Sequence, residues 1–222
     1  MEVVRVADAD AAAEYAARRI AELLRAAKDA RGQAHVALAG GSTPRAAYEE
    51  LGPLVGDWDG VHLWFGDERC VPPDDEEANV RMVRESLRAP RAIEHRILGE
   101  LGPDEAAARY EEELGETVLD VALLGLGPDG HTASLFPDNP ALDARGVAVG
   151  VRGSPKPPPE RVSLTLNKLN SARAIILLTS GAEKRPALER VLAGPDPATP
   201  ASLLDRVKLE VIADEAALPP AS

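Results

Sequence analysis

Apolar residues recur along this chain of 222 residues in two alternating patterns. One has the spacing of a helix buried along a single face; it is clearest over residues 8–30, where Asp8 or Asp10 can cap the first turn and Arg31-Gly32 ends the pattern. The other is a short apolar run of the kind found in buried strands. The patterns predict helices over 8–30, 44–51, 79–87, 103–114 and 181–193, and strands over 35–39, 61–65, 119–124, 147–151, 162–166, 174–178 and 208–213.

Helices and strands that alternate at this spacing are typical of a largely parallel sheet with helices on both faces. We therefore predict an α/β fold of that kind. The sequence shows no internal repeat, and neither of its proline-rich stretches separates two segments with independent cores. A single domain over residues 1–222 is expected, and a chain of this length can bury a sizeable core.

Composition narrows the classes of function. The formal net charge of −12 argues against nucleic acid as a partner, because its phosphates require basic stripes. No apolar run reaches membrane-spanning length and the first residues lack the apolar core of a signal peptide, so we expect no membrane segment and a cytoplasmic location. Cys70 is the only cysteine, which excludes an internal disulfide, fits a reducing compartment and leaves no Cys/His cluster for structural zinc. An anionic substrate would need local basic groups that overcome the field of the whole chain.

A glycine-rich loop with two hydroxyl residues, Gly40-Gly41-Ser42-Thr43, follows the strand predicted over 35–39 and precedes a helix that starts at Pro44. Glycine lets a backbone approach a ligand closely, and the unpaired N–H groups of a helix N-terminus attract anions. The loop could therefore cradle a phosphate. It is equally well explained as a strand–helix turn capped by one of the hydroxyls, and it lacks the Gly-Lys-Ser/Thr of a Walker loop.

An acid and a guanidinium follow the strand predicted over 61–65. If the chain stays extended there, Asp67 and Arg69 project to the same side, two residues apart. Such a pair can hold sugar hydroxyls and an oxyanion. The alternative is a surface ion pair in an acidic loop over 66–77. Cys70 follows Arg69, but no motif marks it as a nucleophile, so a packed free thiol is the better interpretation.

His131 lies in a glycine-rich loop directly after the strand predicted over 119–124, at the end of the strand where ligands gather in parallel sheets. A histidine there can exchange a proton near neutral pH, and Asp129 could orient its ring and raise its basicity. The alternative role for His131 is to cap a short helix. The loop also matches the dinucleotide fingerprint G-x-G-x-x-G, but prolines soon after it leave no room for the crossover helix, so no dinucleotide cofactor is expected.

The three other histidines are expected to have other roles. His35 and His62 lie inside predicted strands, where a structural role is expected. His95 lies in a charged linker and is expected to be solvated.

Two cations, Lys184 and Arg185, follow the strand predicted over 174–178. Ser180 and Glu183 match a capping box, so the helix that begins there would carry both cations in its first turn. Cations at a helix N-terminus interact unfavourably with the helix dipole, and an anion bound there would make the local interaction favourable.

Proline also shapes the two cationic loops. Pro186 predicts a distorted first turn for the helix after Lys184. Lys156 and Arg161 flank three prolines, and they could either add charge from a flexible flap or simply be solvated. Taken together, the loops that follow strands carry the glycine, hydroxyl, acidic, imidazole and cationic groups that recognise a phosphorylated sugar.

Five sequence blocks, in order along nearly the whole chain, resemble the 6-phosphogluconolactonase family. They are LAGGSTP (38–44), WFGDERCVP (64–72) with Asn79 downstream, LLGLGPDGHTASLFP (123–137), KPPPERVSLTLN (156–167) and GAEKRPAL (181–188). The resemblance implies a Rossmann-like α/β fold and metal-free hydrolysis of 6-phosphoglucono-δ-lactone to 6-phosphogluconate, in the pentose phosphate pathway. The expected partner is a small-molecule sugar phosphate, and the expected assembly is a monomer or a small homo-oligomer.

On this hypothesis His131 is the general base, Arg69 stabilises the oxyanion and Asp67 orients the sugar hydroxyls or the water. The amides of residues 40–43 and the ammonium of Lys184 hold the phosphate. No cofactor or metal is expected, and the absence of a G-x-S-x-G motif argues against an acyl-enzyme through serine. The residues expected to bind substrate are Gly40, Gly41, Ser42, Thr43, Asp129, Arg161 and Lys184.

The glucosamine-6-phosphate deaminase/isomerase family is the nearest alternative, because it has similar G-S-T-P and G-x-D-G-H blocks. Members of that family carry a catalytic glutamate where this chain has Phe136, and a tyrosine where it has Arg69. Both differences favour the lactonase. A non-catalytic sugar-phosphate sensor is a third hypothesis, but sensor domains of this kind usually accompany a basic DNA-binding segment, which this sequence lacks.

Overall fold

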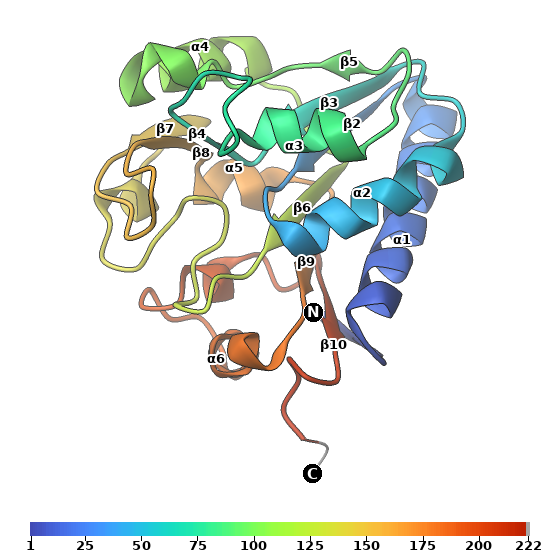
Figure 1. The fold of residues 1–222 in the computed structure, drawn as a ribbon, viewed down its shortest axis with the longest axis vertical. Coiled ribbons are helices and arrows are strands. Elements are labelled where there is room, and N and C mark those ends of the chain that lie inside the picture. Colours follow the sequence, from blue (N-terminus) through green and yellow to red (C-terminus); the bar gives the residue numbers. More distant parts are fainter. Residues whose placement is uncertain (221–222) are drawn as a thin grey trace.

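A seven-stranded parallel sheet forms the centre of the protein, in the strand order β1-β10-β9-β6-β2-β3-β5 (Figure 1). The structure is a computed structural model that describes residues 1–220. All strand pairs of this sheet are parallel, which confirms the α/β fold predicted from the alternating pattern. The strands are β1 (Glu2–Val6), β2 (Ala34–Leu38), β3 (Val61–Phe65), β5 (Ile93–Glu94), β6 (Val121–Gly125), β9 (Ala174–Thr179) and β10 (Leu209–Asp214).

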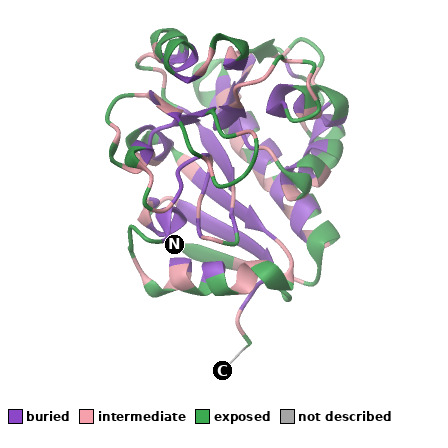
Figure 2. Cartoon of the chain, turned by 60° about the vertical axis from the view of Figure 1, so that its left-hand side comes forward, coloured by how far each residue is buried: buried purple, intermediate pink, exposed green. Residues whose placement is uncertain are grey.

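The central strands are the buried layer of the molecule, and the helices around them keep exposed outer faces (Figure 2). Strands β6 and β9 are almost continuously apolar, as expected for strands covered on both faces. The edge strand β1 was not predicted, because it is mostly exposed and carries charged residues among its valines. Its parallel register with β10 pairs Val3 with Val211.

A small antiparallel sheet of three strands, β4-β8-β7, lies beside the main one. Its strands are β7 (Ala148–Val151), β8 (Arg161–Leu164) and β4 (Asp67–Arg69). The sequence predicted β7 and β8 as strands but not their separate sheet, and it assigned β4 to a loop. Pairing of β4 with β8 sets Asp67 opposite Ser163 and Arg69 opposite Arg161.

The strand predicted over 162–166 is two residues too long at its end. Leu166 opens a short helix, α5 (Leu166–Ser171), because the Thr165 side chain accepts a hydrogen bond from the backbone N–H of Lys168 at 3.1 Å.

Helices cover both sides of the main sheet, as predicted. Figure 1 shows α1 and α2 side by side on one side, with α4, α5 and the small sheet on the other. Asp8 caps α1 and Gly32, at φ 76°, ends it, as predicted. The bounds of these helices and of the two others are α1 (Ala9–Arg31), α2 (Ser42–Val55), α3 (Asn79–Ser86), α4 (Pro103–Leu114) and α6 (Arg185–Ala193).

Over residues 1–220, no helix is at once long and apolar enough to cross a membrane.

Three histidines and Trp64 form a stacked cluster on β2, β3 and the segment after β5. The rings of His35 and His62 lie 4.4 Å apart between centroids, and the indole N–H of Trp64 donates to Nδ1 of His35 at 3.1 Å. His95 stacks on Trp64 at 3.8 Å and hydrogen-bonds Glu113 at 2.6 Å. His35 and His62 therefore have structural roles, whereas the expected solvation of His95 is wrong, because the segment after β5 folds back over Trp64.

We expect acid to destabilise the protein through His35. Burial, with a further contribution from His62, lowers the pKa of His35 from 6.5 to about 4. The unfolded chain therefore takes up this proton at a higher pH than the folded chain does. The stability that neutral His35 supplies is complete above its unfolded pKa and is lost as the pH falls through the range between the two values. Solvent screening limits the effect to about 1–2 kcal/mol.

Thermal melts over a pH series test this expectation. The melting temperature should fall between about pH 6.5 and pH 4 in the wild type and fall less in His35→Gln, which keeps an acceptor for Trp64 but does not titrate. An equally steep fall in the variant would assign the acid lability to other groups.

Candidate active site

A cleft of about 450 Å³ opens at the carboxyl ends of the parallel strands, where ligands collect in open α/β sheets. The loop after β2 forms one wall, and the loop after β6 forms another. The small sheet and the segment after β9 complete it. Its polar lining includes Gly40, Gly41, Asp67, Arg69, Glu77, Gly127, His131, Lys156, Arg161 and Lys184. The structure thus brings together groups predicted from four separate loops.

His131 reaches the cleft from the loop after β6, and Asp129 holds its ring from behind. Nδ1 of His131 lies 2.5 Å from Oδ1 of Asp129. Burial raises the pKa of Asp129, but hydrogen bonds from the His131 ring and backbone and the charge of that ring outweigh it, and the net shift lowers this pKa to about 2. An ionised carboxylate accepts only, so Nδ1 carries a proton and Nε2 is left as the acceptor.

The close approach of these two side chains depends on Gly127. A Cβ atom at Gly127 would collide with the His131 ring and with the Asp129 carboxylate. Asp129 is not among the described residues that line the cleft, and its carboxylate holds the imidazole; its expected contact with substrate stays a prediction. The ring of Phe136 packs on His131 at 4.5 Å between centroids and completes the support.

Asp67 is held in the cleft by two buried side chains. The Ser134 hydroxyl donates to Oδ2 of Asp67 at 2.6 Å, and the amide of Asn79 donates to its backbone carbonyl at 2.8 Å and to Oδ1 at 3.3 Å. Ser134 lies three residues after His131, so one short loop carries the imidazole and a group that fixes Asp67. Sequence reasoning did not assign either supporting residue a role, since both contacts depend on how the chain folds around β4.

Arg69 projects from β4 into the same cleft and keeps hydrogen-bonding capacity there. One terminal nitrogen donates to the backbone carbonyl of Glu77 and lies 3.8 Å from its carboxylate. Nε is buried, and it has no partner within residues 1–220. A buried donor without a partner is costly, which favours an acceptor bound beside it.

Cys70 follows Arg69 and is half-buried. Burial, with the carboxylates of Glu160 and Glu68, raises the pKa of its thiol to about 11. Such a thiol is protonated at neutral pH, which agrees with its interpretation as a packed free thiol.

The N-terminus of α2 lies next to the cleft. Ser42 and Thr43 line a connected hollow of about 230 Å³ that shares Gly40, Gly41 and Lys184 with the main cleft. Helix α2 begins at Ser42, two residues before the predicted start, and Gly41 at φ 109° is its N-cap.

Neither hydroxyl of this turn caps the helix, which corrects that interpretation. Thr43 Oγ1 instead lies 3.1 Å from Oγ of Ser180, so the first turn of α2 contacts the segment after β9. The N–H groups of Ser42 and Thr43 open the helix and have no intrahelical acceptor, and the positive end of the helix dipole lies at this hollow.

Lys184 is the cation that faces the cleft from the segment after β9. Ala182–Lys184 form a single 3-10 turn, and α6 starts only at Arg185, so Pro186 falls in the first turn of that helix. The predicted distortion is confirmed. The capping box is wrong: in the described part of the chain no side chain caps this turn, and the N–H of Gly181 donates to the Asp214 carboxylate at 3.1 Å.

The second predicted cation of this segment turns away. Arg185 donates from Nε and Nη2 to the carbonyl of Ala216 at 3.1 and 2.8 Å. Burial, followed by the positive charge of Lys156, lowers the pKa of Lys184. An anion between the two lysines would relieve this repulsion.

Arg161 lines the cleft, as predicted, but most of its donors serve the chain itself. Its guanidinium contacts the carbonyls of residues 156–158, in the proline-rich loop before β8. The sequence left open whether Lys156 or Arg161 faces the ligand, and both line the cleft.

Comparison with known proteins gives one family and a consistent set of relatives. The family model described as "Glucosamine-6-phosphate isomerases/6-phosphogluconolactonase" matches residues 7–213. A 6-phosphogluconolactonase of Mycobacterium tuberculosis is 38% identical over 210 residues, which cover 86% of this chain and 85% of the relative. A 6-phosphogluconolactonase of Streptomyces coelicolor is 37% identical over 215 residues, which cover 84% of this chain and 81% of the relative.

Solved structures share the fold over almost the full length. The 6-phosphogluconolactonase of Trypanosoma brucei superposes with a TM-score of 0.86 at 28% identity, covering 97% of both chains. A monomeric glucosamine-6-phosphate deaminase superposes with a TM-score of 0.84 at 21% identity, covering 98% of both chains. At that identity the likeness to the deaminase concerns the fold alone.

Proposed function

Because this chain belongs to the glucosamine-6-phosphate isomerase/6-phosphogluconolactonase family, we propose that it hydrolyses 6-phosphoglucono-δ-lactone to 6-phosphogluconate. The observation that carries the proposal is that one cleft is lined by an oriented imidazole, a guanidinium, a carboxylate and two lysines, and that one of those lysines, Lys184, also lines the hollow at the helix N-terminus. A sugar lactone with a phosphate on its far end has the matching distribution of reactive carbonyl and negative charge.

His131 acts as the general base. Nδ1–H is committed to Asp129, so Nε2 accepts a proton from the water that attacks the lactone carbonyl. The ring C–O bond then breaks, and the same proton is delivered to the departing ring oxygen, which leaves a carboxylate and a hydroxyl. General-base catalysis of this kind contributes about 10²–10⁴ in rate, or about 3–5 kcal/mol.

Arg69 and Asp67 act on the same carbon from the small sheet. The Arg69 guanidinium stabilises the negative charge that develops on the carbonyl oxygen, in a site where its buried Nε is otherwise unpartnered in the described chain. Asp67, fixed by Ser134 and Asn79, orients sugar hydroxyls or the attacking water. Both side chains are preorganised, because neighbouring groups hold them before substrate binds.

The phosphate lies at the other end of the cleft. The amides of Gly40 to Thr43, the dipole of α2 and the ammonium of Lys184 supply the positive potential that a chain of net charge −12 needs locally. Binding the phosphate far from the carbonyl fixes the lactone against His131, so remote binding energy supports the chemical step.

Replacing Lys184 by alanine should chiefly weaken binding of the phosphorylated substrate. We expect KM to rise about 10- to 100-fold, with a much smaller change in kcat, because the ammonium contacts a group that does not change during the reaction. Steady-state rates with 6-phosphogluconolactone and with unphosphorylated glucono-δ-lactone measure this; the second substrate should be unaffected. Arg185→Ala is the matched control, since that guanidinium turns away from the cleft. A Lys184→Ala enzyme with lower kcat and unchanged KM would contradict the assignment.

The proposed reaction is distinguished from its alternatives by two assays on the purified protein. Fresh 6-phosphogluconolactone should release acid well above its spontaneous hydrolysis, and glucosamine 6-phosphate should release no ammonia. Ammonia release would instead indicate a deaminase, and silence in both assays would indicate a sensor. Phe136, 2% exposed and packed on His131, stands where the deaminase-type glutamate would be, which supports the lactonase.

A further inference from the structure

The loop before β8 depends on a side chain for its conformation. Residues 153–160 include three consecutive prolines, which have no N–H to donate to a backbone partner. Within residues 1–220, the carbonyls of Pro157 and Pro158 accept hydrogen bonds from Arg161 alone. A loop with so little backbone bonding would otherwise have many conformations.

Arg161 lies between this loop and Phe136, the ring that packs on His131. Nε donates to the carbonyl of Pro158, and Nη2 donates to those of Lys156 and Pro157, each at 3.2 Å. Its side chain is buried, and the guanidinium carbon lies 5.7 Å from the ring centroid of Phe136, which in turn packs on the catalytic imidazole. Three of the five guanidinium N–H groups are therefore used within the protein.

The same loop places Lys156 in the cleft. Its side chain is exposed, yet it lines the cleft together with Lys184, close enough for its charge to lower the pKa of Lys184. The backbone of Lys156 is held by the Ser154 hydroxyl at 2.9 Å and by Arg161. If the loop moved, the two lysines would no longer face one site.

We propose that Arg161 is a positioning residue, which fixes the loop so that Lys156 and Lys184 close on the phosphate from two sides. Arg161 then contributes to substrate binding through Lys156 rather than by its own charge. The inference rests on the proposed function, since the phosphate is that of the lactone. It also gives Arg161, expected from the sequence to bind substrate, a different task.

A double-mutant cycle tests whether the two residues act as one unit. Arg161→Met and Lys156→Gln should each raise KM for 6-phosphogluconolactone by about 5- to 30-fold, with kcat changed less than about threefold. The double variant should match Lys156→Gln alone, because Arg161 has nothing further to position. Effects that multiply in the double variant would show that Arg161 contacts the ligand independently and would overturn the proposal.

A charge-conserving variant separates position from charge. Arg161→Lys keeps the positive charge but cannot reach three carbonyls with a planar fork. We expect its KM to resemble that of Arg161→Met. A KM close to the wild-type value would assign the role of Arg161 to its charge. Because lysine conserves charge and length, this comparison also serves if the methionine variant fails to fold.

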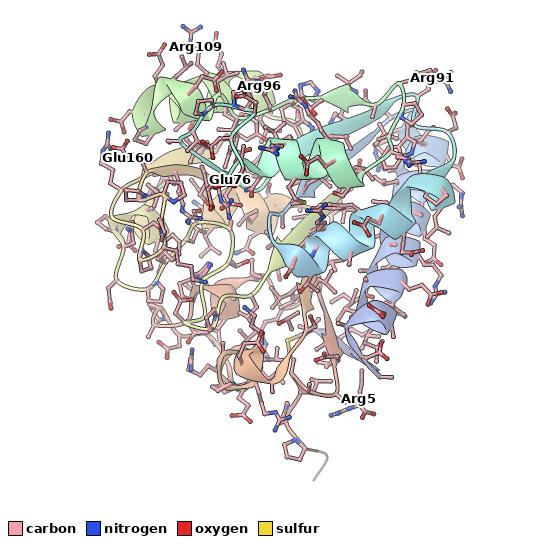
Figure 3. All side chains as sticks on the ribbon, viewed as in Figure 1. Arg5, Glu76, Arg91, Arg96, Arg109 and Glu160 are labelled. Atoms are coloured by element: carbon pink, nitrogen blue, oxygen red, sulfur yellow. The ribbon has the colours of Figure 1, made fainter. Side chains whose placement is uncertain are left out.

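Hydrogen exchange of the free protein gives a readout that needs no turnover. Ser154 donates its N–H to the carbonyl of Pro159 at 3.0 Å, and this bond closes the loop. We expect faster exchange at the amides of Ser154 and Lys156 in Arg161→Met; unchanged exchange would overturn the proposal. Should the wild type fail to hydrolyse the lactone, the proposed function would fall while this measurement still decided whether Arg161 fixes the loop. Arg109→Met, on the outer face of α4 in Figure 3, is the control for the loss of an arginine.

Discussion

Replacing His131 by alanine should lower kcat for 6-phosphogluconolactone by about 10²- to 10⁴-fold and change KM much less. The imidazole accepts a proton only as water attacks, so its removal raises the barrier of the chemical step and leaves phosphate binding intact. Initial rates over a series of substrate concentrations, corrected for the spontaneous opening of the lactone, measure kcat and KM.

Two further variants show whether the loss belongs to the base. Asp129→Asn keeps the size of the side chain but removes the carboxylate that holds Nδ1–H, so kcat should fall while KM stays near the wild-type value. His95→Gln removes a histidine of the stacked cluster, away from the cleft, and should keep kcat. A loss of less than about tenfold in His131→Ala would remove His131 as the base.

The position of His131 could be predicted from the sequence because the loops that follow parallel strands lie at the same edge of a sheet. Strands β2 and β6 are parallel neighbours, so the loops after them meet at one edge whatever the details of packing. Gly40 and His131 therefore come together from segments about ninety residues apart.

No such rule predicts which individual side chains contact one another. The bond from Ser134 to Asp67 spans 67 residues and arises because β4 pairs with β8 in a sheet that the pattern did not reveal. Short antiparallel strands with mixed polarity resemble loops in sequence.

Local geometry decided which cations face the cleft. Lys184 and Arg185 are neighbours, and the 3-10 turn before α6 places Lys184 at the cleft while Arg185 donates to the carbonyl of Ala216. Arg161 is the type of residue expected to bind an anionic ligand, yet three of its N–H groups donate to carbonyls of its own loop. Residue type indicates what a side chain can bind, and the fold decides which acceptor is nearest.

Replacing Arg69 by methionine should lower kcat by about 10²- to 10³-fold, the cost of removing a donor to a developing oxyanion. The reason lies in its surroundings: the guanidinium extends from a short strand into the cleft, and its Nε is buried without a partner in the described chain. A charge so placed, and partly removed from water, interacts more strongly with a new negative charge than an exposed one does. Steady-state rates with both the phosphorylated and the unphosphorylated lactone measure the effect.

Comparing the phosphorylated with the unphosphorylated lactone distinguishes the effect expected for Arg69 from the effect expected for Lys184. In the proposed mechanism Arg69 acts at the carbonyl, which both lactones share, so Arg69→Met should slow both by a similar factor. In the proposed mechanism Lys184 acts at the phosphate, so Lys184→Ala should raise KM for the phosphorylated lactone alone. Glu77→Gln is the matched control, because Arg69 keeps its bond to the Glu77 backbone carbonyl when that carboxylate is removed. Millimolar guanidinium should restore part of the rate in Arg69→Ala by filling the space left. A variant that raised KM for the phosphorylated lactone only, with kcat intact, would place Arg69 at the phosphate and leave the oxyanion to another donor.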